Sequence, residues 1–587
     1  MLALRRALVV FLALAGAAQP VATSAASQHV ATSAASQPVT AAASATRSES
    51  ITAPGRVVIA SDDGGPHRDA ADGSADTPAV ALPGGGVVAV LGDRSGPPGF
   101  DAVELDADGT LDRSFGSGGI ARVPVGLPAF SQIEQVVRQA DGKLVIVGSG
   151  PPAGPSEFAQ LVLVRLDPDG TVDQGFGTAG VDPLPIQASC GSCAAAAVRP
   201  GGGLVVTGRT GRPSPGPTQM LSTRWVVAGL TPTGALDQNF AQAGILTVPA
   251  SAGYGLDLAE LPDGETVALG GGALGGGRFA EYLTRLLPSG ALDASFHGAV
   301  PIPLSPGTGT GLTTNPDQSI VVGVNGGLAR YTSAGTLDPT FGSNGIAPLG
   351  PGKLHQLLAG PGREIVAVLR SGPSSDETTV ERLGSGGAVD QTLGGPAGLP
   401  LDLPFGGGRS GFVFSEFPRP LPPLAQDTFA ASLVARTDGS YLALGGVSVV
   451  QPSARADDLS VTDLAVAAFT SSFDPQTGFG GPAQPLQARI GVVREAATTA
   501  LARHGIAVRL DVSAPGLARI FIKVDHRAVA QSLLPVFAAG PTTVPVELTA
   551  YGEAWLARHP RRRLTATVEA RDVLTDTATA STSGVLR

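Results

Sequence analysis

The chain has 587 residues, enough for several domains, and 81 of them are glycine and 49 are proline. Because 43% of the residues are also hydrophobic, this composition indicates many short strands joined by glycine-rich turns rather than a disordered chain. The net charge of -10 argues against general binding to nucleic acid or to an anionic membrane surface.

The N-terminus has the pattern of an exported protein. Arg5 and Arg6 precede the apolar run ALVVFLALAGAA at 7–18, which is too short to span a bilayer. We therefore predict a signal peptide over 1–18 and a secreted or cell-surface protein without a membrane span. Residues 19–77 are of low complexity and are expected to form a disordered spacer, although 51–60 could be an extra strand that completes the last unit of the following repeat domain.

An internal repeat occupies residues 78–487. Its main landmark is an aspartate that follows an apolar residue, at Asp112, Asp173, Asp237, Asp293, Asp338, Asp390 and Asp474. In the first five copies a phenylalanine follows three residues later, at Phe115, Phe176, Phe240, Phe296 and Phe341. The sixth copy has Leu393 there, and in the seventh Phe479 comes five residues after its aspartate. A turn and a β-branched run, such as QADGKLVIVG at 139–148, precede each copy and are typical of a β-hairpin.

Each repeat is expected to form four strands, which in the second copy are 133–139, 143–149, 159–167 and 181–186. The middle two are apolar on both faces, so the units must stack, and a closed ring leaves no exposed end. We predict an all-β chain with a seven-bladed β-propeller of about 58 residues per blade over 78–487, with an insertion at 396–428. An open solenoid, or a ring of six or eight blades, is the alternative.

Three copies, LDADGTLDRSFGSGGI, LDPDGTVDQGFGTAGV and YTSAGTLDPTFGSNGI, resemble the delta-60 repeat family of bacterial proteins. The resemblance implies an exported β-propeller with no established shared activity, and it assigns no catalytic residue. Two later copies, RLGSGGAVDQTLGG and AFTSSFDPQTGFGG, depart from the family pattern.

Residues 488–587 form a separate segment in which apolar and polar residues alternate. Candidate strands at 506–514, 518–525, 542–550 and 564–572, with a short helix within 494–505, predict a small β-sandwich. It resembles an immunoglobulin-like domain without the cysteine pair.

Asp106, Asp108 and Asp112 have the spacing of a calcium loop, and they are weak candidates for metal ligands. Other copies replace the first two aspartates, whereas Gly, Asp and Phe recur. We therefore expect a structural motif in which Gly allows the turn, Asp caps backbone N–H groups and Phe fills the gap between blades. No cofactor or other metal ligand is expected.

Cys190 and Cys193, in the sequence CGSC, are the only cysteines. Four zinc ligands are not available, and the surroundings lack the helix pattern of a thioredoxin site. A local disulfide formed on export is expected.

Two functions are compatible with the sequence. The first is an exported, monomeric, non-enzymatic binding or scaffold protein whose partner is an unknown extracellular protein or a cell-wall or glycan ligand, and not nucleic acid. The alternative is an extracellular propeller enzyme of the hydrolase, lactonase or quinoprotein-dehydrogenase type with a site at the central channel. Carboxylates or histidines clustered on the innermost strands would favour the enzyme.

Overall fold

The computed structural model describes residues 50–53, 56–59, 77–93, 99–124, 132–152, 159–188, 195–211, 223–249, 253–275, 278–304, 311–360, 363–371, 377–393, 399–400, 425–450, 460–480, 486–513, 516–536, 540–559, 561, 563–572 and 577–586. The predicted signal peptide, most of the predicted insertion at 396–428 and both cysteines lie outside these residues. Of the insertion, 399–400 and 425–428 belong to strands.

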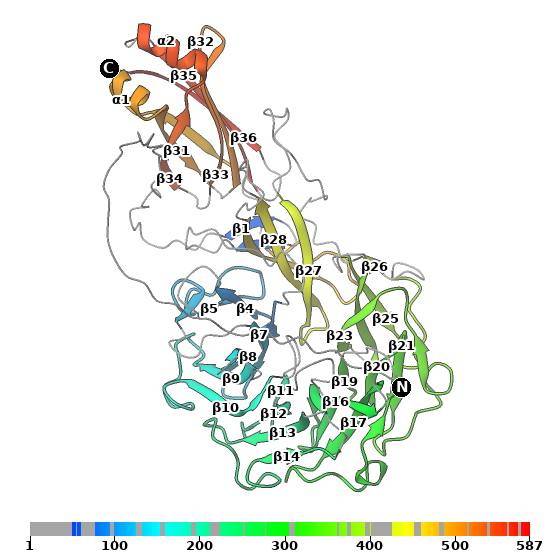
Figure 1. Cartoon of the computed structure of the whole chain (residues 1–587). Helices are drawn as coiled ribbons and strands as arrows, with labels where there is room; N and C mark the ends of the chain where they lie inside the picture. The colour runs from blue at the N-terminus through cyan, green and yellow to red at the C-terminus, as the bar shows by residue number, and fades with distance from the viewer. Residues whose placement is uncertain are drawn as a thin grey trace, which may run out of the picture. The chain divides into compact units, whose positions relative to one another are not determined.

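The described part of the chain has an all-β architecture, and its repeat region consists of antiparallel groups, six of four strands and one of five, which we number units 1 to 7 in chain order (Figure 1). Unit 1 comprises β3 (Ala79–Ala81), β4 (Val87–Asp93), β5 (Gly99–Leu105) and β6 (Ile120–Pro124). Unit 2 comprises β7 (Gln132–Arg138), β8 (Leu144–Pro152), β9 (Ala159–Leu166) and β10 (Val181–Gln187). Unit 3 comprises β11 (Ala195–Val198), β12 (Leu204–Thr210), β13 (Arg224–Leu230) and β14 (Ile245–Thr247).

The remaining units follow the same order. Unit 4 comprises β15 (Gly253–Glu260), β16 (Thr266–Gly275), β17 (Arg278–Leu286) and β18 (Ile302–Pro303), and η2 (His297–Ala299) precedes β18. Unit 5 comprises β19 (Leu312–Thr314), β20 (Ile320–Val324), β21 (Gly327–Tyr331) and β22 (Ile346–Pro348). Unit 6 comprises β23 (Lys353–Ala359), β24 (Ile365–Ser371), β25 (Glu377–Leu383) and β26 (Leu399–Pro400). Unit 7 comprises β27 (Ala425–Ala435), β28 (Tyr441–Val450) and β29 (Ser460–Phe469), together with β1 (Ser50–Ala53) and β2 (Arg56–Ile59).

The two middle strands of unit 2, β8 and β9, are buried on both faces, as the sequence predicts. Along β8, Leu144 and Ile146 pack with side chains of unit 1, whereas Val145 and Val147 pack with side chains of unit 3. Alternate residues of one strand therefore face two different neighbours. A single unit could not bury both faces alone, so stacking of the units is required by the sequence pattern itself.

The first strands of the units touch in an unbroken series within the described part of the chain. β3 contacts β7, β7 contacts β11, and the series continues through β15, β19, β23 and β27. β27 in turn contacts β3, so the series returns to unit 1. Units 2 and 3 are also joined into one sheet where β10 pairs with β12.

Two recurring features join most units to the next, and we call the boundary between two units a seam. First, the backbone N–H after the repeat phenylalanine donates to a turn carbonyl of the next unit, at distances from 2.6 to 3.2 Å. These bonds join Gly116 to Asp169, Gly177 to Thr233, Ala241 to Ser289, His297 to Ala334, Gly342 to Gly386 and Gly480 to Asp108. Second, the five phenylalanines of the repeat motif are buried, and turn glycines of the next unit lie against the rings.

The seam between units 7 and 1 uses the same contacts as the others. Phe479 of unit 7 lies under Gly109, and β2 pairs with β29 in the register Val57 to Val466. This pairing confirms that the segment 51–60, within the predicted spacer, contributes to the last unit. Side chains of β2, of unit 1 and of unit 7 share one buried cluster. Residues far apart in the chain thus form one continuous core.

Unit 7 corrects one detail of the repeat alignment. The backbone N–H of Gln476, not that of Asp474, bonds to the preceding strand at Ala468, as Asp112 does to Glu104 in unit 1. Gln476 stands three residues before Phe479, so the spacing in this copy is normal and Asp474 belongs to the turn before it. The prediction that the seventh copy is stretched is wrong, because glutamine replaces aspartate at the motif position.

The seam between units 6 and 7 exchanges a large and a small residue. Leu393 stands in the place of the motif phenylalanine, and Phe473 stands in the place of the turn glycine. Both side chains are buried, and Phe473 stacks on Tyr441 with 4.6 Å between the ring centroids. The aromatic ring at this seam therefore comes from unit 7 and not from unit 6.

The C-terminal segment forms two sheets and two helices. Its strands are β30 (Ala488–Val492), β31 (Gly505–Val512), β32 (Gly516–Val524), β33 (Arg527–Val536), β34 (Gly540–Glu547), β35 (Arg563–Asp572) and β36 (Thr577–Val585), with α1 (Ala497–Ala502) and α2 (Ala550–Arg558). The sheet orders are β30-β31-β34 and β33-β32-β35-β36, and residues of both sheets belong to one buried cluster. Neither of these helices could cross a membrane, and no helix in the rest of the described chain is long and apolar enough to do so.

Substitution of Gly109 tests whether the seam between units 7 and 1 contributes to stability. Gly109 has φ +85°, and an added Cβ would stand 2.9 Å from the Phe479 ring. Gly201 has φ +91° with nothing within 4 Å of its Cβ position, so it is a matched control. In both Gly→Ala variants the left-handed backbone lowers the free energy of unfolding by about 1–2 kcal/mol. We expect Gly109→Ala to lose about 1–3 kcal/mol more, because it overpacks the seam.

Thermal unfolding of the two variants measures this difference. A lower melting temperature for Gly109→Ala than for Gly201→Ala is expected. Equal melting temperatures would show that the Phe479–Gly109 contact adds nothing to stability.

Candidate functional site

Most seams also carry a side-chain arrangement that we call the clasp, made of an arginine, the motif aspartate, the motif phenylalanine and a turn carbonyl of the next unit. Unit 5 shows it complete. Arg330 on β21 donates from Nε to Oδ2 of Asp338 at 2.9 Å, and its Nη1 donates to the carbonyl of Ser385 in unit 6. The guanidinium also lies 4.6 Å from the ring centroid of Phe341. One buried cation therefore binds an anion of its own unit, a carbonyl of the next and an aromatic face.

The aspartate of the clasp is oriented by its own turn. Oδ1 of Asp338 accepts from the backbone N–H of Thr340 at 3.0 Å and from the Thr340 hydroxyl at 2.7 Å. Oδ2 is left to face the guanidinium of Arg330. The Thr340 hydroxyl and this guanidinium keep the pKa of Asp338 below its usual range, although burial acts against them.

The arginine comes from the strand eight residues before the aspartate in four units. The pairs are Arg165–Asp173, Arg285–Asp293, Arg330–Asp338 and Arg382–Asp390. Because the aspartate N–H bonds back to the carbonyl of that same strand residue, the two side chains leave the backbone close together.

Unit 3 obtains its arginine from a different element. Gly229 occupies the strand position, where an added Cβ would stand 2.3 Å from the Phe240 ring. Arg199, in the hairpin turn that precedes β12, pairs with Asp237 at 3.1 Å and donates to the carbonyl of Pro288 in unit 4 at 2.6 Å. The guanidinium of Arg199 therefore binds the same kinds of partner as Arg330 does, although it comes from a hairpin turn and not from the third strand of the unit.

Unit 7 uses the same hairpin position. Ala468 occupies the strand position, and Arg436 donates to Oε1 of Gln476 at 3.3 Å. Arg436 also donates to the carbonyl of Ala107 in unit 1 at 3.1 Å and lies 5.3 Å from the Phe479 ring centroid. Its clasp therefore extends from unit 7 to unit 1.

Unit 1 departs from this pattern at both positions. Glu104 on β5 occupies the strand position, since Asp112 N–H donates to its carbonyl at 3.0 Å, and Leu82 occupies the hairpin position. Neither can supply a cation to Asp112. Among the seven units of the described chain, unit 1 alone places a carboxylate where the others place a guanidinium or leave the position to glycine or alanine.

Unit 2 has a second cation, Lys143, beside the arginine of its clasp. There Lys143 Nζ lies 2.6 Å from Oδ1 of Asp167 and 2.7 Å from Oδ2 of Asp173. The residues equivalent to this pair in unit 1 are Asp106 and Asp112, and the residue equivalent to the lysine is Gly86. A Cβ on Gly86 would stand 2.4 Å from a backbone oxygen, so no side chain fits there. Unit 1 thus lacks both cations of unit 2 and gains a carboxylate.

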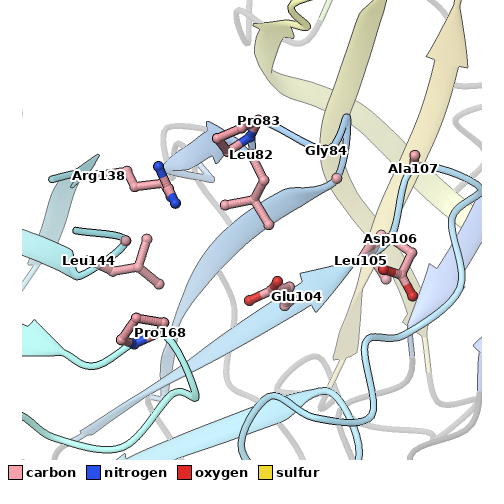
Figure 2. A pocket seen from close by; sticks show the side chains of 12 residues that line it. Leu82, Pro83, Gly84, Glu104, Leu105, Asp106, Ala107, Arg138, Leu144 and Pro168 are labelled. Atoms are coloured by element: carbon pink, nitrogen blue, oxygen red, sulfur yellow. The ribbon is translucent and has the colours of Figure 1, made fainter. Parts of the chain in front are cut away.

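An open cavity of about 340 Å³ lies at the seam between units 1 and 2, beside Glu104 (Figure 2). Leu105 and Leu144 are buried, whereas the residues at its mouth are exposed. The full lining is Leu82, Pro83, Gly84, Gly86, Glu104, Leu105, Asp106, Ala107, Arg138, Gly142, Leu144 and Pro168. In Figure 2 the side chains of Glu104, from β5, and Arg138, from β7, line the cavity from different units.

The unbalanced charge shows in the protonation of the carboxylates. Burial, and then the neighbouring Asp112 and Asp106, raise the pKa of Glu104 to about 7, and Arg138 only partly opposes this. Burial, and then the carboxylates of Asp112 and Asp108, also raise the pKa of Asp106. By contrast, hydrogen bonds from Ser114 lower the pKa of Asp112, so it stays ionised beside Glu104. The cavity therefore holds negative charge that the chain does not neutralise with an ion pair to Glu104.

The predicted calcium loop is folded onto itself. Oδ1 of Asp108 accepts from the backbone N–H and hydroxyl of Thr110, and Oδ1 of Asp112 accepts from Ser114. No group of three or more His, Cys, Asp and Glu residues in the described ranges is arranged to hold a metal ion. Only Asp106, of the three predicted metal candidates, lines the cavity. The predicted disulfide between Cys190 and Cys193 lies outside the described residues.

Sequence reasoning identified the aspartate and phenylalanine of the motif in units 1 to 5 but missed the cation of the clasp. The signal was present, because an arginine precedes the aspartate by eight residues at 165, 285, 330 and 382. Aligning that column would also have singled out Glu104. The exchange of the arginine to the hairpin in units 3 and 7 hides the pattern from a simple spacing search.

Polar side chains on the first strands mainly join one unit to the next. Oδ2 of Asp257 on β15 accepts from the N–H of Leu312 on β19 at 2.9 Å, and burial raises the pKa of this carboxyl to about 6. Gln135 on β7 accepts from Ala196 on β11 in the same manner. The buried carboxyl of Asp257 thus has a structural partner.

Comparison with family models gives one match. Residues 139–176 match the model described as a domain of unknown function (DUF5122) β-propeller. The chain therefore contains a DUF5122 β-propeller repeat, similar to the delta-60 repeats, within a propeller-like fold. No curated protein matches the sequence.

Solved structures match the chain at low identity. A puromycin hydrolase is 14% identical with a TM-score of 0.39, over 75% of this chain and 59% of that one. A glucose dehydrogenase is 17% identical with a TM-score of 0.33, over 53% of this chain and 97% of that one. The polysaccharide lyase Uly1 is 11% identical with a TM-score of 0.37, over 67% and 90%. The chain spans less than two thirds of the puromycin hydrolase, and at these values the likeness says nothing about activity.

Breaking a complete clasp should destabilise the protein. Arg330→Met keeps much of the side-chain volume but leaves Asp338 without its cation, and we expect a loss of about 3 kcal/mol in the free energy of unfolding. Arg122→Met is the control, because Arg122 is exposed and 3.9 Å from Asp101, and such pairs contribute about 0–1 kcal/mol. Urea unfolding measures both variants. Equal losses would contradict a stabilising role for the clasp.

Glu104 should make stability fall as the pH rises. Its raised pKa means that the neutral form is preferred in the folded state, so its contribution is full below about pH 4.5 and is lost as the pH rises to about 7. Glu104→Gln should therefore be more stable than the parent at pH 8, by about 1–2 kcal/mol after allowance for its partial exposure, with little difference at pH 4.

Asp108→Asn is the control with the opposite sign. Hydrogen bonds from Thr110 lower the pKa of Asp108, so the stability that it contributes is present above its usual range and is lost as the pH falls. Melting temperatures of both variants between pH 3 and 8 test the pair. A pH-independent difference between Glu104→Gln and the parent would contradict the assignment.

Proposed function

We propose that this chain is an exported, non-enzymatic binding or scaffold protein. Its body is a seven-bladed β-propeller, in which units 1 to 7 are the blades, followed by an immunoglobulin-like β-sandwich. The closed series of contacts from β3 through β27 and back to β3 supports the ring. The single buried cluster shared by the two C-terminal sheets supports the sandwich.

The observation that carries the binding function is the open seam between units 1 and 2. At five other seams an arginine of one unit donates to a turn carbonyl of the next, whereas this seam has Glu104 in place of the arginine and a cavity of about 340 Å³. That volume falls in the range of small-ligand sites. A ring in which this seam is open suits a protein that presents a preformed site to a ligand.

The N-terminal pattern supports the location in which such a ligand would be met. Arg5, Arg6 and the apolar run at 7–18 favour export, so the partner is an extracellular protein or a cell-wall or glycan ligand. The protein acts as a monomer, since the closed ring needs no second copy.

An array of glycans, cell-wall polymers and extracellular proteins, probed with the purified exported chain, tests this function. We expect retention of one class of ligand without chemical change, and loss of that retention in Glu104→Arg, which would fill the seam. Asp141→Asn, exposed beside the cavity, is the control and should bind normally. Conversion of an array compound would favour the propeller enzyme instead, and binding that Glu104→Arg leaves intact would remove the seam from the proposal.

A further inference from the structure

We propose that the cavity between units 1 and 2 binds a guanidinium group of a ligand, in the position that arginine side chains of this chain occupy at other seams. The inference rests on the proposed binding function and names the chemistry that the site recognises. It rests on comparison of unit 1 with the other units of the same chain.

The other seams show which partners this position offers to a guanidinium. In units 2, 3, 5, 6 and 7 the cation donates to a turn carbonyl of the following unit, at Pro232, Pro288, Ser385, Ser471 and Ala107. In five units it also lies within 4.5 to 5.4 Å of the motif ring. Carboxylate, carbonyl and ring together match the planar donor edge and flat face of guanidinium.

The open seam retains these partners without the cation. Asp112 is ionised and uses only Oδ1 in its turn, and Phe115 is buried at the seam. Pro168, the residue of unit 2 equivalent to Pro232, lines the cavity. Asp112 and Phe115 do not themselves line the cavity, so the groups that a guanidinium placed there would meet are Glu104, Asp106 and the turn at Pro168.

Glu104 adds negative charge to this set. Its carboxylate takes the place of the strand arginine, and Asp106 lies in the same lining. Mutual repulsion of these groups is relieved when a cation enters, so the charge favours a cationic ligand over a neutral one of equal shape. Arg138 lines the same cavity and partly offsets this negative charge, but no ion pair joins it to Glu104 among the described side chains.

The walls and the mouth fit a side chain rather than a compact ion. Leu105 and Leu144 are buried and apolar, and Leu82 lines the same space, so a methylene stem would be covered. Pro83, Gly84 and Ala107 are exposed at the edge, which leaves the cavity open to solvent. The cavity is also larger than a guanidinium alone, so the stem can enter with it.

Isothermal titration calorimetry of the full exported chain at pH 8 and low salt tests the inference. The probes are N-acetyl-arginine amide, its neutral isostere N-acetyl-citrulline amide, and agmatine. We expect the arginine amide to bind at least about tenfold more tightly than the citrulline amide. Agmatine binding equally well would show that a free guanidinium compound suffices, whereas preference for the amide would indicate an arginine within a peptide. Both of these results support the proposal.

Variants separate this site from non-specific charge. Glu104→Gln should weaken the arginine amide at least about tenfold, and Glu104→Arg should abolish its binding while keeping or raising the melting temperature. Asp141→Asn changes the net charge by the same amount as Glu104→Gln and should bind within about twofold of the parent. If Glu104→Arg lowers the melting temperature, Glu104→Gln alone decides the outcome.

Several results would overturn the inference. These are equal binding of the arginine and citrulline amides, no saturable binding of the arginine amide, and undiminished binding by Glu104→Gln. Failure of this inference is distinguishable from failure of the proposed function. In the first case the array still shows a ligand that depends on the seam, and in the second it shows none.

Discussion

The structure depends on one requirement, that neighbouring units meet across apolar sheets whose edges still carry polar backbone groups. Apolar burial holds the faces together but does not set the rotation of one unit against the next. The turn at each seam does so. A glycine with positive φ lets the next unit approach the motif ring, and one N–H group bonds to a carbonyl across the seam. At most seams the arginine of the clasp then binds polar groups of both units, the carboxylate of its own unit and a turn carbonyl of the next.

This requirement explains which parts of the repeat could be predicted. Glycine, aspartate and phenylalanine recur at fixed spacing because each acts within its own turn or at the immediate seam, so the sequence alone indicates their roles. Strand positions in unit 2 were predicted to within three residues at each end for the same reason. Features that depend on contacts between different units were harder to predict. The exchange of Leu393 and Phe473 is invisible to a search for a fixed motif, because the ring moves to another element while the seam stays filled.

The candidate site was missed at the level of sequence, because it is defined by what one copy lacks. Glu104 alone is an ordinary residue on a strand, and only alignment of the units with one another shows that other units have arginine there. The hairpin arginines Arg199 and Arg436 make this more difficult, since Gly229 and Ala468 also lack the strand arginine. In those units the cation is restored from another element, whereas Leu82 and Gly86 restore nothing in unit 1.

An unfilled seam carries a cost that a purely structural ring would avoid. Glu104 lies beside two carboxylates, with its pKa raised to about 7, where arginine would form an ion pair and two hydrogen bonds. Loss of one clasp is tolerable because the backbone bond from Gly116 to Asp169 and the packing of Phe115 still join units 1 and 2. The ring therefore keeps its closure while one seam is open to an external group. Under the proposed function, the same interaction that stabilises other seams from within would serve at this seam to recognise a ligand.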